Sequence, residues 1–140
     1  MRIRSKPWQR RRGAAAAELA LWLPFLGLMF VVAIDFCRVF YASQTIQNCA
    51  FAGAMYASGA SPSNPAVSPS ENPVVKAALA EGVSLNPPLQ AEKVTVVTTG
   101  GQAQVTVSYD FPMIVRWPGV GGTWTITRSV SMTVMPPPGT

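Results

Sequence analysis

The strongest constraint on the fold is an uncharged apolar run of sixteen residues from Leu19 to Ile34. Adding Ala14 to Glu18 lengthens this run to twenty-one residues. As a helix it would measure about 31 Å, close to the ~30 Å hydrocarbon core of a bilayer. The pattern therefore predicts a membrane-spanning helix over residues 14–35, with Glu18 near one end.

The positive charge of the chain is concentrated before this run. Six basic residues and no acid occur in the first twelve positions, whereas the rest of the chain has five basic and six acidic residues. A nucleic-acid-binding protein needs basic residues spread over a face or groove, so the distribution argues against a nucleic-acid partner. By the positive-inside rule, residues 1–13 stay cytoplasmic and the C-terminal part crosses the membrane. A cleaved secretory signal with release of a soluble domain is the competing interpretation, but the run is long for a signal peptide.

The residue inventory offers little for catalysis. The chain has no His, and its two cysteines, Cys37 and Cys49, are not spaced as a CxxC pair. The phosphate-binding, nucleophile-elbow and zinc-protease motifs are also missing from the sequence. We therefore predict no enzyme activity, no catalytic residue, no metal site and no cofactor. On one helix the cysteines would lie roughly 18 Å apart, too far for an intrachain disulfide, so packing roles are expected and an intermolecular disulfide stays open.

Beyond Asp35 the helical pattern continues and becomes amphipathic. One continuous helix is expected from about Ala14 to Ser58, with residues 36–58 as an amphipathic extension. Small side chains replace large ones in the second half of its apolar stripe, which would let another backbone approach closely. The stripe comprises Phe36, Val39, Phe40, Ile46, Ala50, Gly53, Ala54 and Ala57, and the opposite face carries Arg38, Tyr41, Thr45 and Asn48.

A Pro- and Ser-rich linker over residues 59–72 precedes a C-terminal region, residues 73–140, with a different periodicity. Asn72 is expected to cap a short helix that starts at Pro73 and ends before Gly82. The period then becomes two, and Gly100-Gly101 predicts a tight hairpin turn. The predicted strands are Lys93–Thr99, Gln102–Phe111 and Thr123–Met135.

Each long strand has one apolar face. The second strand is predicted to place Val105, Val107, Tyr109 and Phe111 together, and the third to place Trp124, Ile126, Val130, Met132 and Val134 together. A three-stranded sheet cannot bury such a face alone. We expect the small-residue stripe between Ile46 and Ala57 to cover it, which predicts an α+β fold with a long helix packed on a three-stranded antiparallel sheet.

Arg128 interrupts the alternation because it falls on the apolar face of the third strand. Three interpretations stay open: an inward charge that protects an edge strand, a bulge that shifts the phase, or one half of an ion pair.

A known family shares the N-terminal pattern. Gly13-Ala14-Ala15-Ala16-Ala17-Glu18, after Arg10-Arg11-Arg12 and before an apolar helix, resembles the signal that prepilin peptidases cut after the Gly. The stretch IDFCRVFYASQTIQNCAFAGAMYAS resembles the segment that follows the membrane helix in TadE-like proteins, which are minor pseudopilins of the tight-adherence (Tad/Flp) pilus. The fold that this resemblance implies is pilin-like, and TadF-like pseudopilins share much of the same N-terminal pattern.

The resemblance implies a function in pilus assembly or priming. Cleavage by a prepilin peptidase would separate Gly13 from Ala14, and Glu18 and Pro24 would take part in assembly. The implied partners are the peptidase, other pilin or pseudopilin subunits contacting the N-terminal helix, and the lipid bilayer. The implied location is the bacterial inner membrane, crossed once, with a cytoplasmic N-terminus, and the protein would enter or prime the pilus. A signal-anchored envelope protein whose outer domain binds a partner is the alternative.

Overall fold

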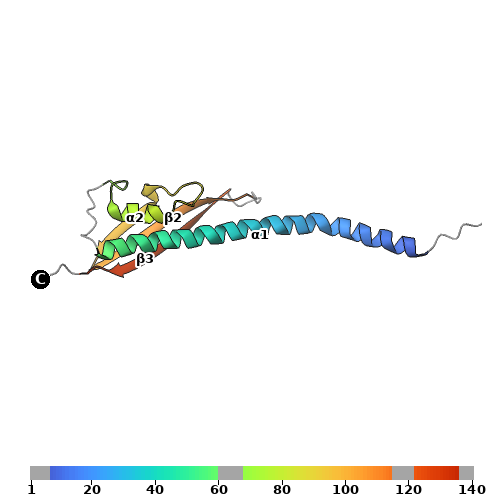
Figure 1. Cartoon of the computed structure of the whole chain (residues 1–140), viewed down its shortest axis with the longest axis horizontal. Coiled ribbons are helices and arrows are strands. Elements are labelled where there is room, and N and C mark those ends of the chain that lie inside the picture. The colour runs from blue at the N-terminus through green and yellow to red at the C-terminus, as the bar shows by residue number, and fades with distance from the viewer. Residues whose placement is uncertain (1–6, 60–67, 115–121, 136–140) are drawn as a thin grey trace, which may run out of the picture. The chain divides into compact units, whose positions relative to one another are not determined.

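The computed structural model describes residues 7–59, 68–114 and 122–135. Its elements are the helices α1 (Pro7–Gly59) and α2 (Pro73–Glu81), a 3-10 turn η1 (Ala91–Lys93), and the strands β1 (Val94–Thr99), β2 (Gln102–Pro112) and β3 (Thr123–Thr133), as Figure 1 shows. The predicted α+β class is confirmed. Much of the predicted linker and of the loop after β2 lies outside the described residues.

The chain divides into two compact units, residues 1–37 and residues 38–140, and α1 contributes residues to both. The helix begins at Pro7, earlier than the predicted start at Ala14. Proline suits the first helical position because its missing N–H has no partner there in any case. Five residues without a helix breaker then separate Pro7 from Gly13, so the helix includes part of the basic segment.

The three strands form an antiparallel sheet in the order β1-β2-β3. Gly100 and Gly101 join β1 to β2 with φ angles of 60° and 76°, which only glycine adopts without strain, so the predicted tight turn is confirmed. Pairing between β2 and β3 runs from Gln102↔Thr133 to Pro112↔Thr123 without a change of register. The unbroken register shows that the bulge considered for Arg128 is wrong.

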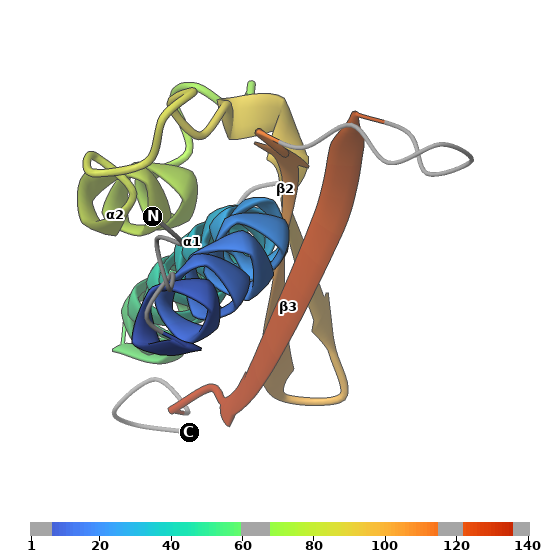
Figure 2. The same cartoon turned by 90° about the vertical axis from the view of Figure 1, so that its right-hand side faces the viewer.

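The second unit has three layers. Figure 2 shows α2 on one side of α1 and the sheet on the other. Alternate residues of the central strand β2 are buried against α1, as the period of two predicted. The fully buried centre combines Ile46 and Cys49 of α1, Val74 and Val75 of α2, and Val105 and Val107 of β2.

Local capping fixes where α2 begins. The Asn72 side-chain oxygen accepts a hydrogen bond from the Val74 backbone N–H at 3.0 Å, and Pro73 occupies the first turn. Gly82 closes the helix through a bond from its N–H to the Leu79 carbonyl. These three positions agree with the prediction from sequence, because a cap, a proline and a terminal glycine together define helix ends.

Candidate functional site

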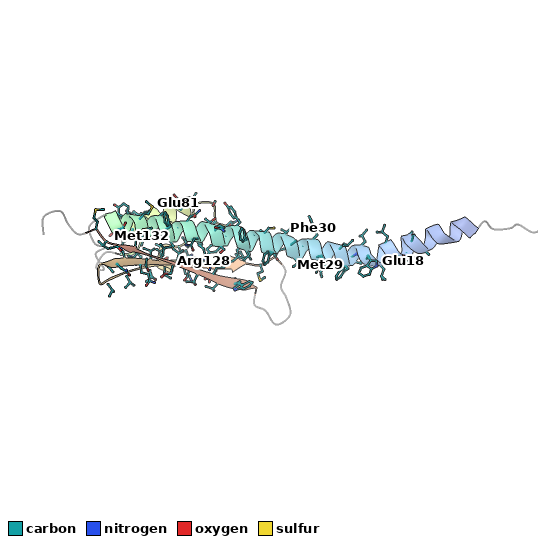
Figure 3. The ribbon with its side chains drawn as sticks, turned by 90° about the horizontal axis from the view of Figure 1, so that it is seen from below. Glu18, Met29, Phe30, Glu81, Arg128 and Met132 are labelled. Atoms are coloured by element: carbon teal, nitrogen blue, oxygen red, sulfur yellow. The ribbon has the colours of Figure 1, made fainter. Side chains whose placement is uncertain are left out.

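The predicted cleavage segment lies on α1 in the first unit. Gly13, Ala14 and Glu18 are all exposed, and Figure 3 labels Glu18 on this helix. A Cβ placed on Gly13 would meet no atom within 4 Å. The Gly13–Ala14 peptide is therefore free of side-chain cover in the described part of the chain, although helical hydrogen bonding would have to open before a protease could bind it.

Large apolar side chains dominate the next twenty residues of α1. Figure 3 labels Met29 and Phe30 among them, and Phe30 is 68% exposed. Monomeric soluble proteins rarely expose a continuous apolar surface of this kind. Among the described residues, the part of α1 from Gly13 to Gly59 is long and apolar enough to cross a membrane, judged by length and composition alone. The exposed members are Leu19, Leu21, Trp22, Leu23, Phe25, Leu26, Leu28, Met29, Phe30, Val31 and Ile34.

Pro24 lies inside this apolar part of α1 and is exposed. Proline has no N–H, so the Ala20 carbonyl lacks the donor that an uninterrupted helix would supply. The neighbouring rings of Trp22 and Phe25 form an edge-to-face contact with centroids 5.8 Å apart. A freed carbonyl in an apolar segment is tolerated in membranes where a neighbouring helix provides a donor.

The small residues of α1 lie where α2 and the sheet approach it within the second unit. A Cβ on Gly53 would stand 3.1 Å from Val105 Cγ1 of β2 and 3.4 Å from Ala78 Cβ of α2. Val105 and Ala78 are both fully buried, with 0% of their surface exposed. A side chain at Gly53 would require Val105 to shift by a few tenths of an ångström, so glycine favours the close approach of the three elements. Ala50, Ala54 and Ala57 of the predicted packing set are buried as well.

Two predicted packing residues lie elsewhere. Phe36 is 74% exposed and Phe40 is 61% exposed, so neither is buried in the fold of the single chain. Thr45, predicted for the polar face, is buried, and its Oγ1 donates a hydrogen bond to the Tyr41 carbonyl at 3.0 Å. The physical reason is that α1 is covered from two sides. Besides the sheet, α2 packs on α1 and buries a side of it that would otherwise face solvent.

The two cysteines differ in environment. Cys37 is exposed and Cys49 is buried, and both are free thiols. Burial, together with the nearby negative charge of Glu81, raises the pKa of the Cys49 thiol to about 11. Cys49 therefore behaves as a protonated packing residue at neutral pH.

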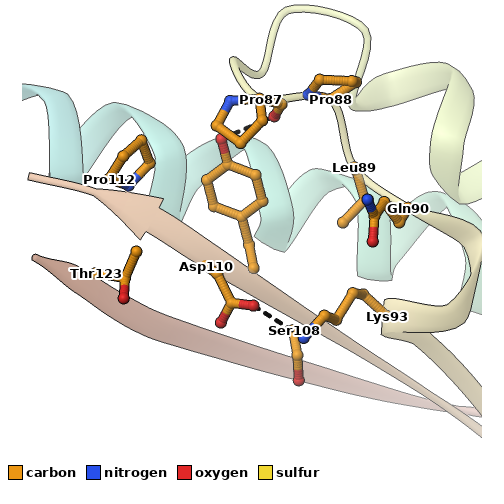
Figure 4. A pocket seen from close by; sticks show the side chains of 10 residues that line it. Pro87, Pro88, Leu89, Gln90, Lys93, Ser108, Asp110, Pro112 and Thr123 are labelled. Carbon is orange, nitrogen blue, oxygen red and sulfur yellow. Dashed lines mark hydrogen bonds and ion pairs between the residues drawn. The ribbon is translucent and has the colours of Figure 1, made fainter.

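A shallow cleft lies where β2 meets the segment before η1, and Figure 4 shows its lining. Its volume is about 340 Å³ and its rim includes Pro87, Pro88 and Leu89. Lys93 Nζ lies 2.9 Å from Asp110 Oδ2, and Thr125 Oγ1 donates to Asp110 Oδ1 at 2.7 Å. These two hydrogen bonds lower the pKa of the Asp110 carboxyl. A carboxylate held ionised between two donors stabilises the sheet face and is a poor proton acceptor.

Tyr109 forms the inner wall of the same cleft. Its hydroxyl donates to the Pro87 carbonyl at 2.9 Å. Burial raises its pKa, and the positive charge of Arg38 opposes that rise. Within the part of the chain that the structure describes, no group of three or more His, Cys, Asp or Glu side chains is placed to hold a metal ion.

Arg128 lies opposite Val107 on the inner face of the edge strand β3. Its guanidinium donates to Ser43 Oγ of α1 at 2.7 Å and to the Thr127 carbonyl at 3.3 Å. An inward-directed charge on an edge strand is a known way to discourage pairing with another sheet. Sequence reasoning found the position but not the partner, because a contact between residues 85 positions apart leaves no local signal.

Comparison with known protein families gives a match in the N-terminal segment. A family model described as TadE-like protein matches residues 13–55. This segment is similar to TadE-like proteins. The match covers Gly13, Glu18 and the whole apolar run. No match was found among curated proteins or among solved structures.

Proposed function

We propose that this chain is a minor pseudopilin precursor that acts in assembling or priming a Tad/Flp-type pilus. The observation that carries the proposal is the TadE-like match, which begins at Gly13 and extends through the exposed apolar helix. In this proposal the protein is a substrate of a prepilin peptidase and is not itself an enzyme. Its partners are that peptidase, other pilin or pseudopilin subunits, and the bilayer.

Cleavage after Gly13 would change the charge of the N-terminus. It removes six basic residues and creates an α-amine at Ala14. The exposure of both Gly13 and Ala14 supports access by a membrane-surface protease. Loss of the basic leader also removes the charges that hold the N-terminus on the cytoplasmic side, which favours extraction of the helix into a fibre.

Glu18 would set the position of each subunit. A charged side chain at the centre of a bilayer costs ~2.5–3.5 kcal/mol on insertion scales, so such groups usually pair. The new Ala14 amine lies about one helical turn from Glu18, and the amine of a neighbouring subunit offers the same partner. A carboxylate that must find an amine within an apolar helix bundle fixes the register between helices. Pro24 would loosen α1 nearby and free the Ala20 carbonyl for a neighbouring helix.

The remaining segments follow from this arrangement. Residues 14–35 would span the inner membrane once, residues 1–13 would lie in the cytoplasm, and residues 36–58 would continue the helix outside it. Residues 59–72 would then connect α1 to the extracytoplasmic region 73–140. The α/β unit would lie outside the inner membrane, and contacts with other subunits would be made through the N-terminal helix.

A charge-neutral substitution at Glu18 tests the assembly role. Cells expressing Glu18→Gln should keep the protein in the membrane fraction but lose surface pili, because the helix inserts without a register-setting charge. Glu71→Gln is the matched control, since Glu71 is an exposed acid in the second unit. Normal piliation with Glu18→Gln would contradict the proposal and favour a signal-anchored protein that acts through its outer domain.

A further inference from the structure

The end of α2 presents a small protruding surface, which we call the knob. It consists of Glu81, the last residue of α2, and Val83 in the turn that follows. Val83 is 82% exposed, more than any other large apolar side chain among the described residues. Glu81 is exposed as well, and no described residue forms an ion pair with it. The knob therefore combines an apolar side chain and a carboxylate that the described part of the chain leaves without a partner.

A groove of about 280 Å³ lies between α1 and β3 in the same α/β unit. Its lining consists of Val39 and Ser43 of α1 and Trp124 to Arg128 of β3. Trp124 is 57% exposed, so much of its apolar surface faces solvent. The Arg128 guanidinium donates to a hydroxyl and to a backbone carbonyl, both neutral groups, and no described acid forms an ion pair with it. The groove therefore combines apolar side chains with a cation that lacks a counter-charge.

Knob and groove complement each other in charge and in apolar character. Glu81 offers the carboxylate that Arg128 lacks, and arginine binds carboxylates with two parallel hydrogen bonds. Val83 offers an apolar side chain to Trp124, and tryptophan and arginine are enriched among the residues that contribute most of the energy of protein interfaces. Within one chain the two surfaces do not meet, because Figure 2 shows α2 and β3 on opposite sides of α1. Figure 3 labels Glu81 and Arg128 on these two sides.

From these observations we propose that the knob of one copy of this chain docks in the groove of a second copy, with Glu81 paired to Arg128 and Val83 packed against Trp124. Because knob and groove lie on opposite sides of α1, both cannot engage the same neighbour, and the contact is head-to-tail. Contacts of this kind continue as an open series of copies or close into a ring. The inference goes beyond the proposed function, which places subunit contacts on the N-terminal helix, because it adds a contact between α/β units.

Sedimentation equilibrium of the full-length chain in density-matched detergent micelles measures this self-association. Glu81→Gln, Val83→Ser and Arg128→Gln should each weaken the association about tenfold. Glu81 and Val83 are exposed, so their substitutions leave the core of the unit intact. The matched controls are Glu71→Gln and Lys76→Gln, which make the same charge changes at exposed residues outside both surfaces and should associate as the natural chain does.

A mixture of two variants tests the head-to-tail direction. The Glu81→Gln chain keeps an intact groove, and the Arg128→Gln chain keeps an intact knob. One knob-groove contact can form between these two chains, after which neither free end can add a further copy. We therefore expect the mixture to form dimers with the affinity of the natural chain, whereas the natural chain grows to larger oligomers as its concentration rises.

The controls make the contact refutable. Association of Glu81→Gln and Arg128→Gln as strong as that of the natural chain would overturn the inference, and would place any self-association on another surface such as the N-terminal helix. Weakening by Glu71→Gln as large as by Glu81→Gln would overturn the specific pairing. A mixture that associates no better than either variant alone would overturn the head-to-tail contact. None of these results changes the piliation expected for Glu18→Gln, so the proposed function is tested separately.

Discussion

Replacing Gly53 with Leu should loosen the whole α/β unit. The first carbon of the new side chain would already lie 3.1 Å from Val105 Cγ1 and 3.4 Å from Ala78 Cβ. Gly53 and both neighbours are buried, so the remaining carbons of the new side chain would have to displace packed atoms. Overpacking of this kind costs up to about 3 kcal/mol, while the better helix propensity of Leu returns about 1 kcal/mol. We therefore expect a net loss of about 2 kcal/mol of unfolding free energy.

Amide hydrogen exchange in β2 measures this loss in the full-length chain in detergent micelles. Amides of a central strand exchange through opening of the whole cooperative unit, so a loss of about 2 kcal/mol should speed their exchange about thirtyfold. Gly59→Leu is the matched control, because a Cβ there meets nothing within 4 Å. Exchange in Gly53→Leu no faster than in Gly59→Leu would refute the close packing of α1 between α2 and β2.

Three further outcomes follow from the described contacts. Asn72→Ala removes the acceptor for the Val74 N–H and should cost about 1 kcal/mol, seen as faster exchange of α2 amides; unchanged exchange there would contradict the capping role. At pH 8 iodoacetamide should label the exposed Cys37 but spare Cys49, whose pKa of about 11 leaves about one thiol in a thousand ionised; equal labelling in the folded chain would contradict the burial of Cys49. Because the folded state holds the Cys49 proton more tightly than the unfolded state, stability should fall as pH rises from about 9 to 11. Cys49→Ala should remove that part of the fall, and an identical pH profile in the variant would show that another group causes it.

The strands and their pairing were accessible from the sequence because β2 alternates strictly, β3 alternates except at Arg128, and a Gly-Gly pair marks the turn. The same holds for α2, where Asn72, Pro73 and Gly82 define both ends. These are local signals, written within a few residues of the feature that they specify. For that reason the α+β class could be predicted, and so could the burial of the inner face of β2.

What the sequence could not give depends on contacts between distant residues. Thr45 is buried because α2 packs on a second side of α1. No residue near Thr45 in the chain indicates that this side of the helix is buried. The exposure of Phe36 and Phe40 could not be predicted for a similar reason. Helical spacing shows which face of the helix a side chain lies on, but it does not show how far along the helix the sheet and α2 extend. The ion pair of Lys93 with Asp110 likewise needs the register of β1 on β2. Within the proposed site, the motif at Gly13 and Glu18 was visible because it is contiguous.

The N-terminus of the membrane-extracted protein tests the central proposal most directly. Intact mass and N-terminal sequence should be measured after expression with and without the cognate prepilin peptidase, for the natural chain and for Gly13→Ile. The proposal predicts a chain that begins at Ala14 only when the peptidase is present and Gly13 is retained. A chain that begins at Met1 under every condition would contradict processing as a prepilin and leave a signal-anchored envelope protein.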